Sequence, residues 1–444
     1  MQKEDNYTFL TQEPIPKVIG TMAVPTIIAM LITNLYNIVD TYFVGKINTQ
    51  ATAAVGIVFS VMFFIQAFSF FFGNGSGNYI SRELGSKNRR NAEQMASTAL
   101  GYAFISSIII VVFGLIFLDK ICIFLGSTST ILPYTRQYLG ISLLGIPFIM
   151  CTLCMNNQMR FQGYARYSMY GIVVGALLNC VLDPLFIFTF NMGFRGAAIA
   201  TVSSQAVGFV VMYVMSRHKD IIHYTPRNFS HRGMFIKEII AGGTPSLSRQ
   251  GLASIATIAL NVSASHYGDA AIAAMSIVNR ITMFIFSMII GLGHGYQPMC
   301  GFCYGAKRYE RVKAGFWFCV KFGTSFLFFW AVILFIFSAE AIELFRNDFD
   351  VISIGTRALR YQLLTFPLWS FILMSNMIMQ TCRKTFRANL LAASRQGLFF
   401  IPLIFILPHY LGLTGVEICQ ACGDFITLLL TAPIMFFAFR EMRV

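Results

Sequence analysis

Residues 25–45 read PTIIAMLITNLYNIVDTYFVG, an apolar run with a single acid, Asp40. Residues 176–190 read ALLNCVLDPLFIFTF and carry a second acid, Asp183. About 20 apolar residues span a bilayer as a helix, and a carboxylate at that depth is costly unless it is protonated, paired or hydrated. We therefore interpret both runs as membrane spans whose acids form a proton or sodium site. The alternative is that both carboxyl groups are structural hydrogen-bond struts between helices.

The composition of the chain is that of a membrane protein. Hydrophobic residues make up 56% and charged residues 12%, whereas a soluble domain carries about 25% charged residues. The apolar runs predict an all-α membrane protein with twelve transmembrane helices, and the internal repeat described below divides them into two six-helix bundles. The opening residues lack the apolar core of a cleavable signal peptide. The expected spans are residues 18–44, 53–80, 94–118, 137–158, 167–190, 196–216, 237–265, 270–298, 314–337, 358–380, 390–411 and 414–438.

The basic residues predict the orientation of the chain in a plasma (inner) membrane. With twelve spans, the termini and alternate loops share one side, and that side holds 22 Lys and Arg against 5 in the opposite loops. Lys and Arg are enriched in cytoplasmic loops, so both termini should be cytoplasmic. This distribution also explains the net charge of +14 as topology and contact with anionic membrane lipids. Nucleic-acid binding is disfavoured because the basic residues are scattered over every inner loop.

The two halves of the chain repeat each other at an offset of 220 residues. We therefore expect an N-terminal lobe (1–216), a cytoplasmic linker (217–236) and a C-terminal lobe (237–444). Because each repeat has an even number of spans, the relating pseudo-twofold axis should lie along the membrane normal, with the substrate between the halves. The matched pairs include Pro25 with Pro245, Phe64 with Phe284, Gly73 with Gly293, Gly85 with Gly305, Lys87 with Lys307 and Pro147 with Pro367.

The two acids break this repeat. Asp40 aligns with Leu260, and Asp183 aligns near Ile401. The scaffold is duplicated, but the ionisable pair belongs to the N-terminal half alone. This asymmetry favours a functional role over packing.

Four segments resemble signatures of the MATE (multidrug and toxic compound extrusion) exporters. They are NIVDTYFVGKINTQATAAVG (37–56), SRELGSKNRRNAE (81–93), LNCVLDPLFIFTFNMGFRGAAIATVSSQ (178–205) and GHGYQPMCGFCYGAKRYERV (293–312). The likeness covers essentially the whole chain and is closest to the bacterial and archaeal branch with acids in spans one and five. It implies a secondary-active antiporter that exports lipophilic, often cationic, drugs by alternating access and confers antibiotic resistance.

The resemblance also implies a cation site in the N-terminal lobe. In that branch the site uses an Asp in the first span, an Asn and an Asp in the fifth, and a Thr in the sixth. The matching residues are Asp40, Asn179, Asp183 and Thr201. A Tyr one turn before the first Asp matches Tyr36. Another branch carries a Glu in span seven and an Asp in span ten. We expect no acid in either of these spans of this chain, so the resemblance favours a site in the N-terminal lobe alone.

The residue chemistry supports the same site independently. Tyr36 and Asp40 are four apart, as are Asn179 and Asp183, so each pair shares a helix face. Pro184 cannot donate a backbone N–H, which frees the carbonyl of Cys180. Oxygen ligands suit a hard cation such as sodium, and apolar surroundings favour a protonated carboxyl. Proton and sodium therefore both stay open as the coupling ion, with no other cofactor and no resident metal expected. Pro25 is the predicted hinge of the first helix.

Other polar residues give weaker signals. Asp424 in the twelfth span is expected to face the interior of the C-terminal lobe, in a structural or a hydration role that the sequence leaves open. Arg249 and Arg280 either line a C-lobe cavity or pair with Asp424. Three CxxC pairs lie in apolar helices without a His partner, so metal binding and disulfides are not expected. Met and aromatic side chains suit promiscuous binding of apolar and cationic compounds. The candidates for the substrate cavity are Tyr36, Met62, Phe64, Gln66, Met150, Met155 and Asn156.

These features predict a monomeric multidrug antiporter rather than an enzyme. The alternative within the same superfamily is a flippase for lipid-linked oligosaccharides or lipids, which predicts a more cationic cleft. An intramembrane enzyme is disfavoured because the chain has no HExxH or GxSxG motif. An ATP-driven pump is disfavoured because no GxxxxGK[ST] motif occurs, and the twelve-span repeat disfavours a receptor or channel.

Overall fold

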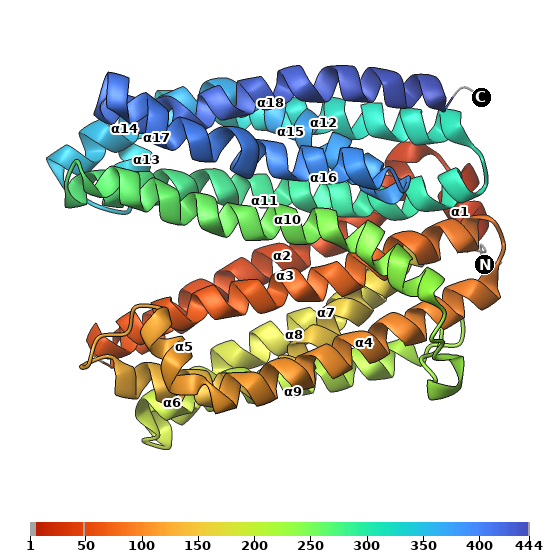
Figure 1. The fold of residues 1–444 in the computed structure, drawn as a ribbon, viewed down its shortest axis with the longest axis horizontal. Coiled ribbons are helices and arrows are strands. Elements are labelled where there is room, and N and C mark those ends of the chain that lie inside the picture. The colour runs from red at the N-terminus through yellow and green to blue at the C-terminus, as the bar shows by residue number, and fades with distance from the viewer. Residues whose placement is uncertain (1–5, 48, 443–444) are drawn as a thin grey trace. The chain divides into compact units, whose positions relative to one another are not determined.

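The computed structural model describes residues 6–47 and 49–442, and within these residues the chain forms helices and no strands. Figure 1 shows the arrangement of the helices. They are α1 (Asn6–Gln12), α2 (Ile15–Gly45), α3 (Thr49–Gly85), α4 (Arg89–Ile116), α5 (Leu118–Phe124), α6 (Leu132–Leu143), α7 (Ile146–Phe161), α8 (Ala165–Pro184), η1 (Leu185–Thr189), α9 (Gly193–Ser216), η2 (Pro226–Asn228), α10 (Gly233–Ser265), α11 (Asp269–Gly305), α12 (Tyr309–Ile336), α13 (Ser338–Glu343), α14 (Phe349–Thr365), α15 (Leu368–Thr381), α16 (Thr385–Ala393), η3 (Ser394–Phe399), α17 (Phe400–Leu411) and α18 (Leu413–Glu441).

The predicted all-helical membrane fold is confirmed. Among the described residues, nine helical segments are long and apolar enough to cross a membrane. Two further spans are bent pairs: α6 with α7 meets at 50°, and α14 with α15 meets at 55°. The remaining predicted span, residues 237–265, corresponds to α10, which has 33 residues. The apolar runs of the sequence therefore locate the long helices, although α10 itself is not among the segments that are apolar enough to cross a membrane.

The chain packs into two units whose boundaries fall inside helices. The first unit comprises Met1–Leu10 and Val24–Leu247, and the second comprises Thr11–Ala23 and Ser248–Val444. The start of α2 thus packs with the second unit, and the start of α10 packs with the first. These packing units differ at their edges from the repeat-based lobes, whose division at residues 217–236 stays a prediction.

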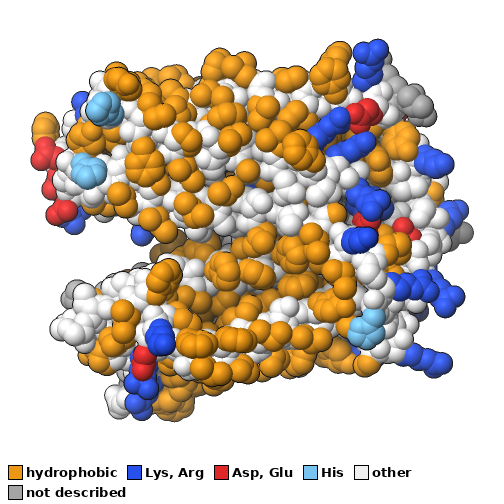
Figure 2. Space-filling view, viewed as in Figure 1, with side chains coloured by type: hydrophobic (Ala, Val, Ile, Leu, Met, Phe, Trp, Pro, Cys, Tyr) orange, Lys and Arg blue, Asp and Glu red, His pale blue; other side chains and the backbone are white. Residues whose placement is uncertain are grey.

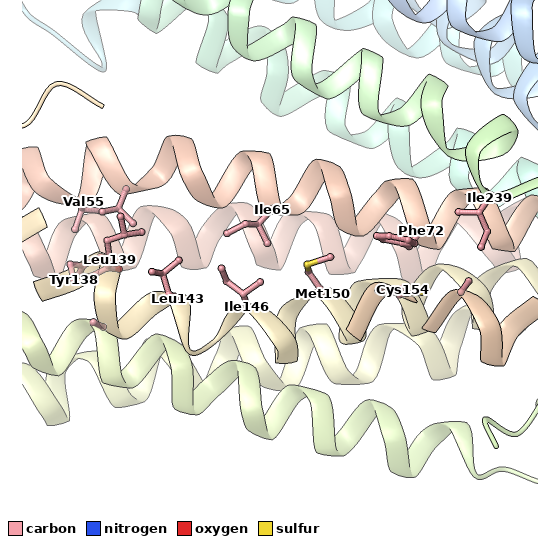
Figure 3. Close-up of a cluster of buried hydrophobic side chains, with 14 of the residues drawn as sticks. Val55, Ile65, Phe72, Tyr138, Leu139, Leu143, Ile146, Met150, Cys154 and Ile239 are labelled. Atoms are coloured by element: carbon pink, nitrogen blue, oxygen red, sulfur yellow. The ribbon is translucent and has the colours of Figure 1, made fainter. Parts of the chain in front are cut away.

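The core of the first unit is apolar and lies between α3, α6 and α7. Figure 3 shows Ile65 and Phe72 of α3 beside Leu143, Ile146 and Met150. All five side chains are less than a tenth exposed. Burial of such side chains allows dense packing, which holds α3, α6 and α7 against one another.

Each packing unit contains a close contact between two helix backbones. The start of α10 meets α3 in the first unit, and the start of α2 meets α11 in the second. In the first unit, a Cβ at Gly75 of α3 would lie 2.4 Å from the carbonyl oxygen of Ile239. In the second unit, a Cβ at Gly295 of α11 would lie 2.6 Å from the Cα atom of Ala23. Only glycine permits helix backbones to approach this closely. Gly75 and Gly295 are one repeat apart, so both units use the same contact.

The repeat also extends to backbone geometry. Lys87 and Lys307 both adopt a positive φ, of 63° and 58°, which is uncommon for residues other than glycine. Gly163 and Arg383, also 220 residues apart, adopt φ values of 94° and 60°. Each of these residues lies in the short turn between two spans. The turns are therefore duplicated together with the helices.

Basic side chains gather at one end of each unit, as Figure 2 shows. In the first unit they include Arg82, Lys87 and Arg89, at the end of α3 and the start of α4. In the second unit they include Lys307 and Arg308, in the matching turn. This distribution agrees with the loop assignment made from the sequence, and the cytoplasmic location of that end stays a prediction.

Candidate functional site

The first unit brings together the two acids of the sequence prediction. Asp40 lies on α2, and Asp183 lies near the end of α8, where its side chain is fully buried. The two carboxyl groups are neighbours that interact with each other. Two neighbouring carboxylates repel each other when both are charged, and a bound proton or cation relieves that repulsion. The pair is therefore suited to hold and release a positive charge.

Two further residues complete the polar cluster. The Asn179 amide Nδ2 donates to Asp183 Oδ1 over 3.2 Å and to Thr201 Oγ1 over 3.4 Å. The Thr201 hydroxyl donates to the backbone carbonyl of Ala197 over 3.1 Å. Asp40, Asn179, Asp183 and Thr201 thus meet as the resemblance implied. Their role in cation coupling stays a prediction.

Three oxygen atoms in this cluster are buried without a hydrogen-bond donor among the described residues. They are Asp40 Oδ1, Asn179 Oδ1 and Asp183 Oδ2. A buried oxygen without a donor costs free energy, and a proton or hard cation would satisfy it. Carboxylate and amide oxygens are the ligands that such cations prefer. The residues present therefore fit the predicted coupling ion.

Close packing of α8 against α9 sets the geometry of the cluster. A Cβ at Gly171 would lie 2.7 Å from the carbonyl oxygen of Gly208, and a Cβ at Gly175 would lie 3.2 Å from that of Ser204. Asn179 and Asp183 continue the same four-residue spacing along α8, so they lie on the face that meets α9. The glycine contacts therefore bring Asn179 within reach of Thr201.

Two tyrosines lie close to the acids. Tyr36 is one turn before Asp40 on α2 and interacts electrostatically with both carboxyl groups. Tyr138 of α6 lies beside Thr201 and also interacts with both. Sequence reasoning identified Tyr36 but missed Tyr138, because nothing in the sequence relates the start of span four to the acids.

The helix that carries Asp183 changes its form directly after the site. α8 ends at Pro184, and the π-helix η1 follows at Leu185–Thr189. A proline cannot supply the backbone N–H of a regular helix, and π-helical turns are frequent at functional sites. By contrast, α2 is an uninterrupted helix through Pro25. The hinge role of Pro25 stays a prediction.

The candidate cavity residues lie in different environments. Met150 and Met155 are fully enclosed in hydrophobic clusters of the first unit. The Asn156 amide donates to the carbonyl of Ser168 over 2.6 Å. Met62 and Gln66 are half-buried, and Phe64 is 57% exposed. Their contact with substrate stays a prediction.

The second unit contains a buried ion pair at Asp424. Asp424 Oδ1 accepts hydrogen bonds from Arg395 Nε at 2.8 Å and from Gln420 Nε2 at 2.9 Å. Asp424 Oδ2 accepts from Trp369 Nε1 at 2.6 Å and from Thr365 Oγ1 at 3.4 Å. Both oxygens are thus satisfied, unlike those of the first unit. This arrangement indicates a structural carboxylate.

Arg395, not Arg249 or Arg280, is the ion-pair partner of Asp424. Arg395 lies in the π-helix η3, and its guanidinium sits 3.6 Å from the centroid of the Trp369 ring. Arg249 instead donates to Asn376 Oδ1 over 2.8 Å. Arg280 is exposed on α11. The predicted alternative that Arg249 or Arg280 pairs with Asp424 is therefore wrong, and the alternative that they line a C-lobe cavity stays a prediction.

Two more charged residues differ from the sequence interpretation. Arg160, assigned to an inner loop, is only 2% exposed and donates to Asn74 and Asn157 on α3 and α7. Glu238 lies near the start of the seventh span and contradicts the expectation that this span contains no acid. It forms an ion pair with Arg82 at 2.8 Å. Both residues lie at span ends, where sequence alone does not separate loop from buried helix.

Comparison with known proteins identifies the family. The MatE family model matches residues 25–185 and 245–406, two blocks that begin one repeat apart. The multidrug export protein MepA of Staphylococcus aureus (strain MSSA476) is 26% identical over 421 residues, covering 93% of this chain and 92% of MepA. A solved MATE in the straight conformation is 25% identical with a TM-score of 0.93, covering 100% of both chains. A solved MATE in the bent conformation is 25% identical with a TM-score of 0.93, covering 100% of this chain and 99% of that one. Because the family model matches well over half of the sequence, this chain belongs to the MatE family and is a transporter rather than an enzyme.

Proposed function

We propose that this chain is a multidrug efflux transporter that exchanges an inward proton or sodium ion for an outgoing lipophilic, often cationic, drug. The name of the relative MepA supports multidrug export. The observation that carries the ion coupling is the contact between Asp40 and Asp183, with three buried oxygens that lack a donor. No other part of the described chain combines two neighbouring carboxyl groups with unmet oxygen atoms.

The coupling follows from the charge of this pair. With a proton or cation bound, the repulsion between Asp40 and Asp183 is relieved. When the ion leaves, the repulsion returns and biases α2 toward a different conformation. Solved relatives in straight and bent conformations support a change of this kind. An ion and a drug that favour different conformations weaken each other's binding by the same factor.

The test is dye efflux from everted membrane vesicles, with the pH gradient and the sodium gradient collapsed separately. Export by the unmodified protein should stop when one of the two gradients is collapsed, which identifies the ion. Asp183→Asn should abolish gradient-driven efflux, because an amide cannot take up a proton and is a weaker cation ligand. Glu310→Gln is the matched control, since the Glu310 side chain is 85% exposed. It should export like the unmodified protein.

Two results would contradict the proposal. The first is export at the unmodified rate by Asp183→Asn at equal expression. The second is a loss of export by Asp183→Asn that matches a loss of protein, which favours a structural strut. The flippase alternative predicts dye export that depends on neither gradient, so the same vesicles separate it from the antiporter.

A further inference from the structure

Arg249 is a cation in the middle of the seventh predicted span. It is the central residue of α10, which runs from Gly233 to Ser265. It is half-buried, and its Nη1 donates to the side-chain oxygen of Asn376 over 2.8 Å. A cation at membrane depth is costly, and it usually pairs with a carboxylate or marks a functional site. Arg249 has only a neutral amide as its hydrogen-bond partner among the described residues.

Other arginines of this chain show how a charge at such a position is ordinarily compensated. Arg395 pairs with Asp424, Arg357 pairs with Glu417 at 2.9 Å, and Arg82 pairs with Glu238. Arg160 is fully enclosed and donates hydrogen bonds to two asparagines. Arg249 differs from all of these because its charge is both uncompensated and partly accessible.

The orientation of the partner amide is well determined. Asn376 is 2% exposed, and its Nδ2 donates to the carbonyl oxygen of Ala388 over 2.8 Å. This bond requires Nδ2 on that side, so Oδ1 faces the guanidinium. Asn376 therefore fixes the Arg249 side chain without neutralising it.

The scaffold does not need the arginine. In the first unit, Asn156 is the repeat equivalent of Asn376 and makes the same bond, to the carbonyl of Ser168 over 2.6 Å. The position equivalent to Arg249 is Ala29. The asparagine is thus held in place in both units, with an arginine beside it in only one. The arginine is therefore not required for the bond that holds this asparagine.

We propose that Arg249 binds the carboxylate of an amphipathic aromatic substrate. This inference rests on the proposed multidrug export and deepens it, since it adds compounds with an anionic group to the lipophilic cations. A guanidinium carries five donors in a planar fork that matches the two oxygens of a carboxylate. One donor is used by Asn376, so others remain for the substrate. The apolar surroundings strengthen such a charge-assisted bond.

A pair of dyes tests the inference directly: a rhodamine with a free benzoate, and its methyl ester. They share the aromatic body and differ at the carboxylate. Binding of each dye to the purified protein in detergent should be measured by fluorescence polarisation. Arg249→Gln should weaken binding of the acid about tenfold relative to the ester, a loss of about 1.4 kcal/mol. Arg249→Lys keeps the charge and should lose less.

Two further variants sharpen the result. Asn376→Asp places a carboxylate beside Arg249 within the protein, so it should also weaken the acid relative to the ester while Arg249 is intact. Lys321→Gln removes a positive charge from an exposed position on α12 and should leave the acid-to-ester ratio unchanged. Thermal melting of each purified variant confirms that it is folded.

The outcomes are distinguishable. An equal loss of acid and ester in folded Arg249→Gln, or no loss of either, would overturn the role of Arg249. The same holds if Asn376→Asp leaves the acid-to-ester ratio unchanged. If the unmodified protein binds the ester but not the acid, the inference fails while multidrug binding stands. If it binds neither dye, the proposed function fails as well.

Discussion

At the scale of single residues, the two buried carboxylate sites of this chain are opposites. Asp183 is beside another acid, and one of its oxygens lacks a donor among the described residues. Asp424 is surrounded by donors, including Arg395 and Trp369. A buried carboxylate whose two oxygens both accept hydrogen bonds from the protein is part of a satisfied polar network. Asp424 is therefore suited to holding the second unit together, and Asp183 to exchanging a cation.

This contrast predicts that Asp424→Asn destabilises the protein without removing its gradient dependence. The substitution leaves the Arg395 charge buried without a counter-charge, and breaking a buried ion pair costs about 3–5 kcal/mol. The melting temperature in detergent should fall, and Arg395→Gln in the same chain should recover part of the loss. Dye efflux by surviving Asp424→Asn protein should still stop when the coupling gradient is collapsed.

Two results would count against this assignment. An unchanged melting temperature for Asp424→Asn would show that the pair contributes little to stability. Efflux that no longer depends on any gradient in Asp424→Asn would assign ion coupling to the second unit.

The sequence predicted some of these residues and not others for a physical reason. Asp40, Asn179 and Asp183 stand out because polar groups are rare in apolar helices, and a spacing of four places Asn179 and Asp183 on one face. The pairing of Asp424 with Arg395 could not be predicted from residue spacing. Arg395 lies in the π-helix η3, whose wider turns change which face a side chain occupies. Sequence periodicity assumes regular turns throughout.

At the scale of secondary-structure elements, the site depends on how closely α8 approaches α9. Gly171 and Gly208 allow direct backbone contact, as do Gly175 and Ser204. The two helices lie side by side in Figure 1, and Asn179 reaches Thr201 from this contact. Small residues at a helix interface permit such approach in membranes.

Gly171→Ala should therefore impair both stability and coupling. The new methyl group would lie 2.7 Å from the Gly208 carbonyl oxygen, which forces the helices apart. Overpacking of this kind costs about 1–3 kcal/mol and would separate Asn179 from Thr201. Thermal melting and gradient-driven efflux, normalised to the amount of folded protein, measure the two effects.

The matched control is Gly56→Ala on α3, where an added methyl group meets nothing within 4 Å. It should melt and export like the unmodified protein. Equal behaviour of the two alanine variants would show that the approach of α8 to α9 does not set the site.

At the scale of the whole molecule, the positions of the spans were predictable because bilayer thickness fixes their length. The bends between α6 and α7 and between α14 and α15 were not predicted. Pro147 and Pro367 lie at those bends, yet the angles depend on the packing of neighbouring helices. The packing units could not be predicted from the sequence either, because an apolar run does not show which neighbouring helix it contacts.

The charge distribution predicts the topology of the chain. Fusions of alkaline phosphatase, which is active only outside the cytoplasm, should be inactive after Lys87 and after Lys307. They should be active after Ser127 and after Asn347, in loops on the opposite side. Immunoblots of each fusion control for its amount. Activity after Lys87 or Lys307 would reverse the orientation and contradict cytoplasmic termini.

The exchange of helix starts between the two packing units has a consequence for the origin of the chain. The start of α10 fills the glycine contact at Gly75, and the start of α2 fills the equivalent contact at Gly295. The start of the first helix of each sequence half thus belongs to the packing unit formed mainly by the other half, as an exchanged segment does in a domain-swapped dimer. A six-span ancestor with this contact could complete its packing only with a second copy. Duplication within one chain supplies both copies of this contact in a single polypeptide, while the acids Asp40 and Asp183 stand in one half only.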